Sequence, residues 1–406
     1  MNSHKIKQLP RFLEKITQEL SGAFPCVFIA GARQIGKSTL AMKLVDNYVL
    51  LDDVSIRESI EKDAIEFVKT QEKPVCFDEI QKMPSLLEAI KINIDAKKNE
   101  GDFLLTGSAN VLDIKGVGDT LAGRMINLVM YPLTMKEQNS SLENCFVRLL
   151  NNNWTIKKID FSQQLKMILI GGYPEAIKIK SNKLRRYWFS SYISTYIERD
   201  VRDIGDIRDV MKFIKMFNLL APRSAAIFNI KNFSMKAGIA EKTAANYLSV
   251  LKLIFQIQTL PPYFSNISKR FIKMPKSYFS DTGILAHLLG IQTNAEFEQS
   301  EYKGMLIETF VFMELTKHIA YSGLNANLYH FRTTDQKEID FIIEHKNKII
   351  ALEVKASHSV RKEDFKHIIN FAKKEPKLEL GVVFYVGDKV LPFGDKLIAL
   401  PLGFFF

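Results

Sequence analysis

The chain has 406 residues, too many for one ordinary domain, so we expect two or three domains. Hydrophobic residues make up 47% and charged residues 25% of the sequence, which excludes an intrinsically disordered chain. The formal net charge of +11 favours a polyanionic partner such as DNA, but the lysines form no block, and a lysine-rich genome explains the same charge equally well.

The cysteines and the apolar runs indicate which cellular compartment to expect. The three cysteines are Cys26, Cys76 and Cys145, and none belongs to a C-x-x-C pair, so no zinc site is expected. Their number fits a reducing cytoplasm. The first residues, Met1 to Glu14, are polar and basic, so no signal peptide is expected. No run reaches about 18 apolar residues, so we expect a cytoplasmic protein without a membrane partner.

Short apolar runs alternate with amphipathic stretches in the first third of the chain. Each apolar run predicts a strand buried on both faces: Cys26–Ala30, Tyr48–Leu51, Val75–Phe77, Phe103–Leu105 and Met125–Met130. Helical periodicity marks Lys37–Val45, Ser55–Lys69 and Ser85–Lys97. This alternation predicts an α/β domain with a parallel sheet, which we assign to residues 1–136.

A phosphate-binding loop follows the first predicted strand and opens the first predicted helix. It matches G-x-x-x-x-G-K-[S/T] in the context that this motif requires. The glycines let the backbone wrap phosphates, and the loop N–H groups favour anions. Lys37 is expected to reach the β- and γ-phosphates of ATP, and the Ser38 hydroxyl to ligate Mg²⁺. The predicted nucleotide-binding residues are Gly31, Ala32, Arg33, Gln34, Ile35, Gly36, Lys37, Ser38 and Thr39.

Two adjacent carboxylates end the predicted strand that begins at Val75. Asp78 is expected to hold the Mg²⁺ shell, and Glu79 to polarise the attacking water as a general base. An N-cap is the alternative for adjacent acids, but their place directly after a strand, roughly 40 residues beyond the loop, favours catalysis.

Three further residues are candidates for nucleotide sensing or charge stabilisation. Thr106 and Ser108 follow the next predicted strand and can sense the γ-phosphate, unless they are only helix caps. Arg124 can stabilise charge, in cis or from a neighbouring subunit, which makes a homo-oligomer a candidate state. A surface salt bridge is the alternative for Arg124.

The middle of the chain is predicted to be mostly helical. Residues 137–164 are rich in Asn, Ser and Lys and are assigned as a linker with room for one helix. Within residues 165–290, Asn232–Ala237, a turn at Gly238 and Glu241–Leu253 predict a helix-turn-helix. The run Ile254–Leu260 predicts a following strand, an order typical of a winged helix.

Basic residues of this region are candidates for DNA contacts. Lys242 and Asn246 lie on a face of the second helix away from its apolar stripe. A basic, aromatic stretch follows, from Tyr263 to Lys276, and it contains Lys269 and Arg270. A packing module with a solvated strand face is the alternative.

Residues 291–406 are predicted to form a mixed α and β domain with a cluster of carboxylates. Asp340 precedes Glu353 by 13 positions, which suits two strands of one hairpin, and Glu353 and Lys355 share a strand face. Asp340 and Glu353 together can hold Mg²⁺, and Lys355 can orient a water for attack on a phosphodiester. Glu308, in a preceding helix-like run, completes the ordered nuclease-like set Glu308, Asp340, Glu353 and Lys355. A surface salt-bridge ladder is the alternative.

Together these motifs resemble a prokaryotic AAA-type P-loop ATPase family that carries a C-terminal domain of unknown function 4143. The resemblance rests on the loop at 31–40 and on the segments 77–81, 104–108, 121–124, 171–175, 198–201 and 278–283. Ala32 and Ser38 depart from the family pattern, which has Pro and Thr there. The resemblance implies an AAA-like core, a winged-helix region and a C-terminal domain similar to the PD-(D/E)xK (restriction-endonuclease-like) nuclease fold.

Competing functions remain open at the level of sequence. The first is an ATPase that drives a DNA-binding module able to cut DNA. The second is an ATP-dependent regulatory or scaffold protein whose nuclease-like domain is inactive and binds a partner protein. A weaker third is a signalling ATPase without a nucleic-acid role.

Overall fold

The computed structural model of the chain describes residues 9–97, 99–108, 121–197, 201, 207, 209–264, 274–333, 335 and 337–406. The chain divides into two compact units. Unit 1 consists of Met1–Pro132, Ser194–Asp206 and Val250–Phe255. Unit 2 consists of Leu133–Ile193, Ile207–Ser249 and Gln256–Phe406. In the part of the chain that is described, no helix has the length and apolar character needed to cross a bilayer.

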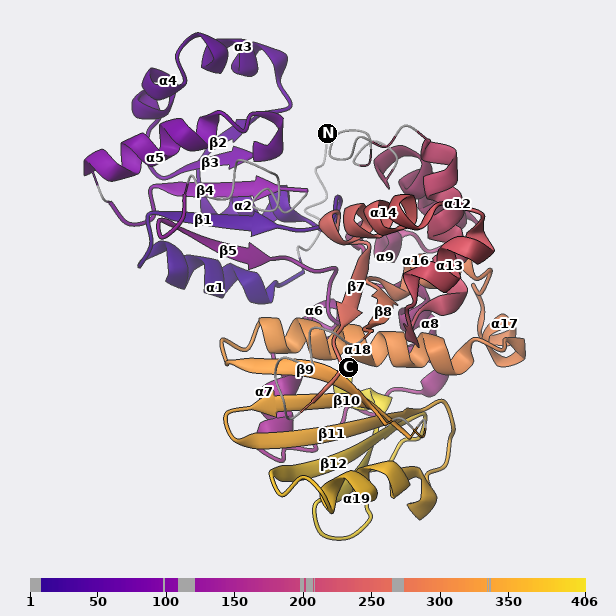
Figure 1. Cartoon of the computed structure of the whole chain (residues 1–406). Coiled ribbons are helices and arrows are strands. Elements are labelled where there is room, and N and C mark those ends of the chain that lie inside the picture. The colour runs from indigo at the N-terminus through magenta and orange to yellow at the C-terminus, as the bar shows by residue number, and fades with distance from the viewer. Residues whose placement is uncertain are drawn as a thin grey trace. The chain divides into compact units, whose positions relative to one another are not determined.

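Unit 1 contains a parallel five-stranded sheet in the order β2-β3-β4-β1-β5 (Figure 1). The strands are β1 (Cys26–Ala30), β2 (Asn47–Leu50), β3 (Val75–Asp78), β4 (Phe103–Gly107) and β5 (Met125–Val129). The predicted strands and the parallel pairing are confirmed. Only β1, β3 and β4 are buried along their whole length, because β2 and β5 are the edges of the sheet.

Helices connect the strands of unit 1. They are α1 (Phe12–Ser21), α2 (Lys37–Leu44), α3 (Val54–Lys62), α4 (Ala64–Thr70), α5 (Leu86–Lys97) and the short 3₁₀ helix η1 (Ile80–Lys82). The prediction of a single helix at Ser55–Lys69 is wrong, because the helix is interrupted at Asp63, where the backbone is extended. The Asp63 carboxylate caps the second of the two helices by accepting the N–H of Glu66. Three phenylalanines, Phe67, Phe77 and Phe103, form part of the core.

The middle part of unit 2 is mostly helical. Its helices are α6 (Met135–Gln138), α7 (Cys145–Leu150), α8 (Phe161–Ile170), α9 (Pro174–Lys178), α10 (Asn182–Ser191), α12 (Val210–Leu220), α13 (Ile230–Ala237), α16 (Thr282–Leu288) and α17 (Asn294–Gln299), and α14 (Glu241–Leu253) begins in this unit. Gly238 at the predicted turn has φ of +67°, a conformation that glycine adopts without strain. The predicted helices on both sides of that turn are confirmed.

A small antiparallel sheet of unit 2 has the order β6-β8-β7. Its strands are β6 (Ala226–Ile227), β7 (Ile257–Leu260) and β8 (Lys276–Phe279), so β8 is the central strand. Residues 137–164 contain α7, which packs against the long helix α18 (Lys303–Ala320). Asn144 there donates its amide to the His318 carbonyl at 2.8 Å, which ties this segment to α18.

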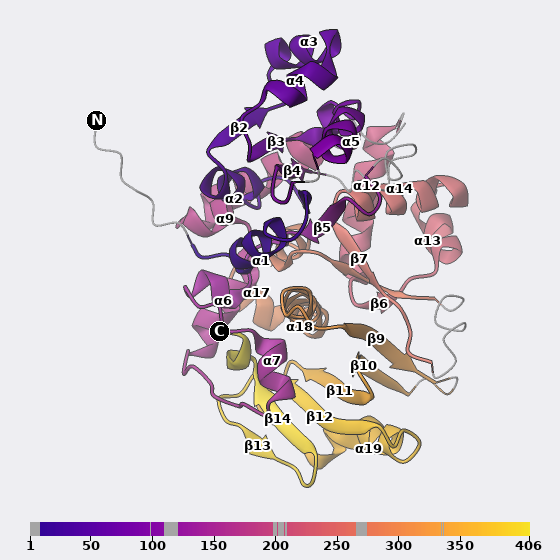
Figure 2. The ribbon, with the colours of Figure 1, turned by 90° about the vertical axis from the view of Figure 1, so that its left-hand side faces the viewer.

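The C-terminal part of unit 2 is a six-stranded mixed sheet beside α18 (Figure 2). Its elements are β9 (Ala326–Arg332), β10 (Glu338–His345), β11 (Lys348–Lys355), η5 (Lys362–Phe365), α19 (Lys366–Ala372), β12 (Leu378–Tyr385), β13 (Leu391–Pro392), β14 (Leu397–Pro401) and η6 (Leu402–Phe405). β9, β10 and β11 form an antiparallel meander, and β12 pairs with β11 in parallel. The predicted hairpin that carries Asp340 and Glu353 is confirmed.

Candidate nucleotide site and C-terminal acidic cluster

The loop between β1 and α2 has the backbone that the phosphate-binding motif requires. Gly36 has φ of +99°, which disfavours any residue with a side chain. A Cβ on Gly31 would lie only 2.3 Å from the carbonyl oxygen of Met130, so the close approach of β5 also requires glycine. The Lys37 ammonium is buried and donates to the carbonyls of Gly31 and Ala32, both at 2.8 Å. These contacts fold the loop around its lysine.

Asp78 lies at the carboxyl end of β3 and meets the start of α2. The Ser38 hydroxyl donates to Asp78 Oδ2 at 2.9 Å, which joins the two predicted Mg²⁺ ligands directly. The hydroxyls of Tyr48 and Thr106 donate to the same carboxylate. Burial and the hydrogen bond to Asp78 raise the pKa of Tyr48 well above its ordinary value, so the phenol remains a donor. Tyr48 had no sequence signal for this role.

Glu79 follows in the left-handed region, with φ of +61°. Its backbone N–H donates to Thr106 Oγ1 at 3.3 Å, and its side-chain oxygen accepts from the amide of Gln81. The same amide donates to Ser108 Oγ at 2.9 Å. The predicted base and the predicted sensor are therefore connected through Gln81, a residue to which the sequence assigned no role.

The outer residues of the predicted loop differ in exposure. Arg33 is buried, whereas Thr39 is exposed on α2. Gln34 has φ of +60°, and its Oε1 is buried without a hydrogen-bond partner. Ile35 is fully buried, so its side chain anchors the loop to the core.

Two of the four predicted C-terminal residues, Glu308 and Asp340, face one further residue, Lys276. Its ammonium lies 2.8 Å from Glu308 Oε1, 2.5 Å from Glu338 Oε1 and 3.8 Å from Asp340 Oδ1. On β11, which pairs with the strand β10 that contains Asp340, the Lys355 ammonium lies 3.2 Å from Glu353 Oε2. The expectation that the basic stretch ending at Lys276 is a solvated or DNA-binding face is wrong for this residue, which is 2% exposed.

Burial and mutual charge perturb this cluster. Burial and the charge of Asp340 raise the pKa of Glu353 to about 8 and that of Glu308 to about 7. Burial alone would lower the pKa of Lys276, but the charges of Glu308, Asp340 and Glu338 outweigh it and raise the pKa. Lys276 therefore stays charged at neutral pH.

Three protein-family models match successive segments of the chain. Residues 23–139 match the family described as AAA domain. The chain contains an AAA-type P-loop ATPase domain. Residues 303–405 match a domain of unknown function (DUF4143), and residues 162–295 match another (DUF8612).

Several whole proteins are similar to this chain. An uncharacterized protein of Mycobacterium tuberculosis is 26% identical over 382 residues, which cover 93% of this chain and 80% of that protein. An uncharacterized protein of Methanocaldococcus jannaschii is 24% identical over 393 residues, with 91% and 82% covered. Among solved structures, a Walker-type ATPase of Pyrococcus abyssi has 14% identity and a TM-score of 0.45, with 70% of this chain and 97% of that chain covered.

Arg124 lies at the far edge of the AAA-domain sheet. Met125 pairs with Cys26 and Val129 with Ala30, so Arg124 stands beside the amino end of β1, whereas the P-loop follows its carboxyl end. Its guanidinium pairs with the Asp95 carboxylate at 2.6 Å. A role towards the nucleotide of the same chain has no support from this geometry, and a role from a neighbouring copy stays a proposal.

The DNA-contact candidates are only partly described. Lys242 and Asn246 are exposed on α14, while Ala244 between them is buried. Lys269 and Arg270 lie outside the described residues.

Two of the segments on which the family resemblance rests, 171–175 and 278–283, contact each other. Asp281 Oδ2 accepts the N–H of Gly172 at 2.7 Å, and Oδ1 accepts those of Gly283 and Ile284 at 2.9 and 3.0 Å. A Cβ on Gly171 would lie 2.4 Å from the same carboxylate. The segments 171–175 and 278–283 thus hold α8, α9 and α16 together. Of the segment 198–201, only Val201 lies within the described residues.

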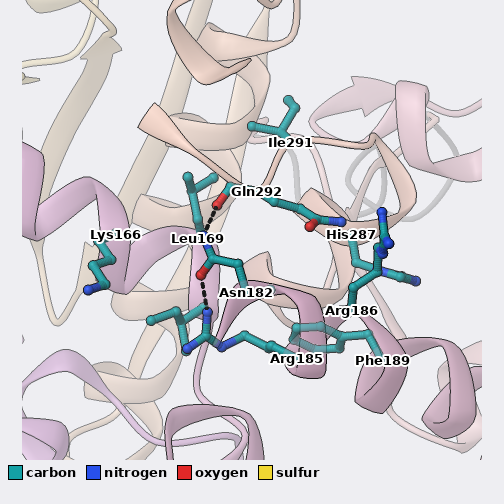
Figure 3. A pocket seen from close by; sticks show the side chains of 11 residues that line it. Lys166, Leu169, Asn182, Arg185, Arg186, Phe189, His287, Ile291 and Gln292 are labelled. Atoms are coloured by element: carbon teal, nitrogen blue, oxygen red, sulfur yellow. Dashed lines mark hydrogen bonds between the residues drawn. The ribbon is translucent and has the colours of Figure 1, made fainter. Parts of the chain in front are cut away.

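A small cavity of unit 2 lies beside α8, α10 and α16 (Figure 3). Basic side chains line part of it: Lys166, Arg185 and Arg186. The buried guanidinium of Arg185 donates to the Ala176 carbonyl at 2.9 Å and to Asn182 Oδ1 at 2.8 Å, and it also reaches the Ile179 carbonyl. Arg185 therefore holds the end of α9, and its charge serves the fold.

Proposed function

We propose that this chain binds and hydrolyses ATP with Mg²⁺ in its AAA domain. The observation that carries the proposal is the hydrogen bond of 2.9 Å between Ser38 and Asp78, which brings the end of the P-loop and the acidic end of β3 into one site. Lys37 stands at the same loop and supplies a positive charge for the β- and γ-phosphates.

The residues of this site fit Mg²⁺. A hydroxyl from Ser38 and a carboxylate from Asp78 are the hard oxygen donors that this ion takes beside nucleotide phosphates. When bound, Mg²⁺ would neutralise charge on the β- and γ-phosphate oxygens. Tyr48 and Thr106 hold the Asp78 carboxylate from both sides, which fixes its orientation before nucleotide arrives.

Glu79 is the proposed general base. It stands next to Asp78 at the same edge of the sheet, and its carboxylate is oriented by Gln81. In this role it accepts a proton from the attacking water, while Ser108, tied to the same glutamine, is the proposed sensor of the γ-phosphate.

The test is a pair of substitutions in the full chain. Lys37→Ala is expected to abolish ATP turnover by removing the charge that binds the phosphates. Glu79→Gln is expected to retain ATP binding and to lower kcat by roughly 10²- to 10⁴-fold, because the base is lost while the phosphate contacts remain. Phosphate release and calorimetry measure the two quantities. Unchanged hydrolysis in both variants would remove the assignment.

A second proposed function is DNA binding by the region of α13 and α14. Two helices joined at Gly238, with the antiparallel strands β7 and β8 after them, support a winged-helix arrangement. The exposure of Lys242 and Asn246 on α14 leaves both side chains accessible to a phosphate backbone.

A further inference from the structure

The acidic cluster of the DUF4143 region already contains a cation. Three carboxylates face the Lys276 ammonium, at 2.8 Å for Glu308, 2.5 Å for Glu338 and 3.8 Å for Asp340. The lysine is 2% exposed, so this charge is not shared with bulk solvent. A buried ammonium is retained only where such partners compensate for its lost hydration.

Lys276 is fixed in this position by the fold. It opens the central strand β8 and is paired on both sides, with Ile227 of β6 and Leu260 of β7. Two positions later on the same face, Tyr278 stacks on Phe312 of α18 with ring centroids 4.0 Å apart. The strand pairing therefore fixes the backbone from which the buried lysine side chain extends to the carboxylates.

Further hydrogen-bond donors contact the same carboxylates, and one of them shares Glu308 Oε1 with Lys276. The Tyr278 hydroxyl donates to Glu308 Oε1 at 2.8 Å, and the Val354 N–H donates to Asp340 Oδ2 at 2.8 Å. The Lys355 ammonium donates to Glu353 Oε2. Within the described residues, no group of three or more His, Cys, Asp or Glu side chains is arranged to hold a metal ion.

Mg²⁺ does not fit between these side chains while Lys276 is in place. The ion needs near-octahedral oxygen ligands at roughly 2.1 Å, and here Glu308 Oε1 is hydrogen-bonded to the ammonium at 2.8 Å while Asp340 Oδ1 lies 3.8 Å from it. Two cations sharing one carboxylate in a buried site would repel each other strongly. The expectation that Asp340 and Glu353 hold Mg²⁺ for phosphodiester cleavage therefore conflicts with this geometry.

We propose that Lys276 is the resident cation of this cluster, that its ammonium takes the place of a divalent metal between Glu308 and Asp340, and that the DUF4143 region folds without a metal and does not cleave nucleic acid. The cation comes from the segment that matches DUF8612, so the cluster also fastens that segment to the DUF4143 region.

An unpartnered oxygen of Glu353 favours the opposite outcome, in which the protein binds a divalent ion. Glu353 Oε1 is buried without a hydrogen-bond partner, and a metal ion held by Asp340 and Glu353 beside Lys276 would supply one. The two outcomes differ in whether the protein with its native lysine takes up a divalent ion at Asp340.

The experiment uses the full chain without nucleotide, in an Asp78→Asn background that removes the metal ligand of the AAA domain. Calorimetric titration with Mn²⁺ is expected to show no binding. Lys276→Met keeps an unbranched side chain that is one atom shorter and removes its charge. It is expected to lower the melting temperature of unit 2 by roughly 10 °C, because the carboxylates lose their counter-ion. Mn²⁺ is expected to bind this variant and to restore most of that loss.

Second substitutions and a matched control keep the result interpretable. Glu308→Gln added to Lys276→Met is expected to recover stability without metal, since it removes one of the repelling charges. Lys348→Met, which breaks an exposed pair between Lys348 of β11 and Glu379 of β12, is expected to change nothing.

Variants that keep Lys276 provide an independent test, should Lys276→Met fail to fold. Mn²⁺ binding by the Asp78→Asn protein that is lost on Asp340→Asn would overturn it, as would Mn²⁺-dependent cutting of plasmid DNA that disappears with the same substitution. Absence of both supports it.

Discussion

Gln81 connects the two residues that the proposed hydrolysis needs most. Its amide donates to the Glu79 carboxylate and to Ser108 at 2.9 Å, and Glu79 itself has φ of +61°. A non-glycine residue in the left-handed region costs roughly 1 kcal/mol or more, so the surrounding contacts must hold it there. Gln81 is one of these contacts, and we regard it as a positioning residue.

Gln81→Met keeps the shape of the side chain and removes both hydrogen bonds. We expect kcat for ATP to fall by roughly 10-fold, because Glu79 loses its orientation, while the Kd for ATP and the melting temperature stay nearly unchanged. Steady-state hydrolysis and calorimetry measure these quantities. Gln71→Met at the end of α4 is the matched control, since the Gln71 amide donates to the Phe67 carbonyl and lies away from Glu79 in the sequence. A kcat equal to or above that of the native protein contradicts the positioning role.

The elements of the AAA domain were predictable because apolar runs and glycine positions are local signals. The strand at Cys26–Ala30 is wholly buried, and the loop after it has a motif whose glycines the backbone geometry requires. Contacts between distant segments had no such signal. Tyr48 reaches Asp78 across 30 residues, and Lys276 reaches Glu308 across 32. Lys276 was predicted to be exposed, because a lysine side chain is rarely buried.

Helix α14 allows the proposed DNA contact to be tested. Lys242→Ala combined with Asn246→Ala removes two exposed polar groups, and neither supports the apolar stripe that contains Ala244. We expect a several-fold loss of affinity for double-stranded DNA and a shallower dependence of binding on salt, since one phosphate contact is lost with the lysine. Fluorescence anisotropy at several salt concentrations measures both.

The control for this variant is Lys215→Ala with Lys236→Ala, two lysines on the neighbouring helices α12 and α13. We expect the control to retain most of the affinity. Equal losses in both variants indicate a general charge effect, and unchanged binding in the α14 variant rules out this face as the DNA contact.

At the scale of the whole molecule, the segment that matches DUF4143 and most of the segment that matches DUF8612 belong to unit 2. The Tyr263 N–H donates to the His330 carbonyl at 2.6 Å, and the His330 N–H donates to the Pro261 carbonyl at 3.0 Å. Together with the stacked rings of Tyr278 and Phe312, these contacts join the strands β7 and β8 and the residues after β7 to the DUF4143 region. We therefore expect unit 2 to unfold in a single transition, separate from the AAA domain.

A substitution of Asp281 can show whether the two units unfold independently. Its buried carboxylate accepts three backbone N–H groups, so Asp281→Ala leaves three buried donors without a partner. Each such donor costs roughly 1–3 kcal/mol, and we expect the transition of unit 2 to move down by roughly 10 °C or more. ATP stabilises only the folded domain that binds it, so the rise that ATP and Mg²⁺ produce in the transition of the AAA domain should persist in the variant. Differential scanning calorimetry with and without nucleotide measures both effects. A single transition that moves as a whole, in the native protein and in Asp281→Ala, shows that the two units unfold together and contradicts their independence.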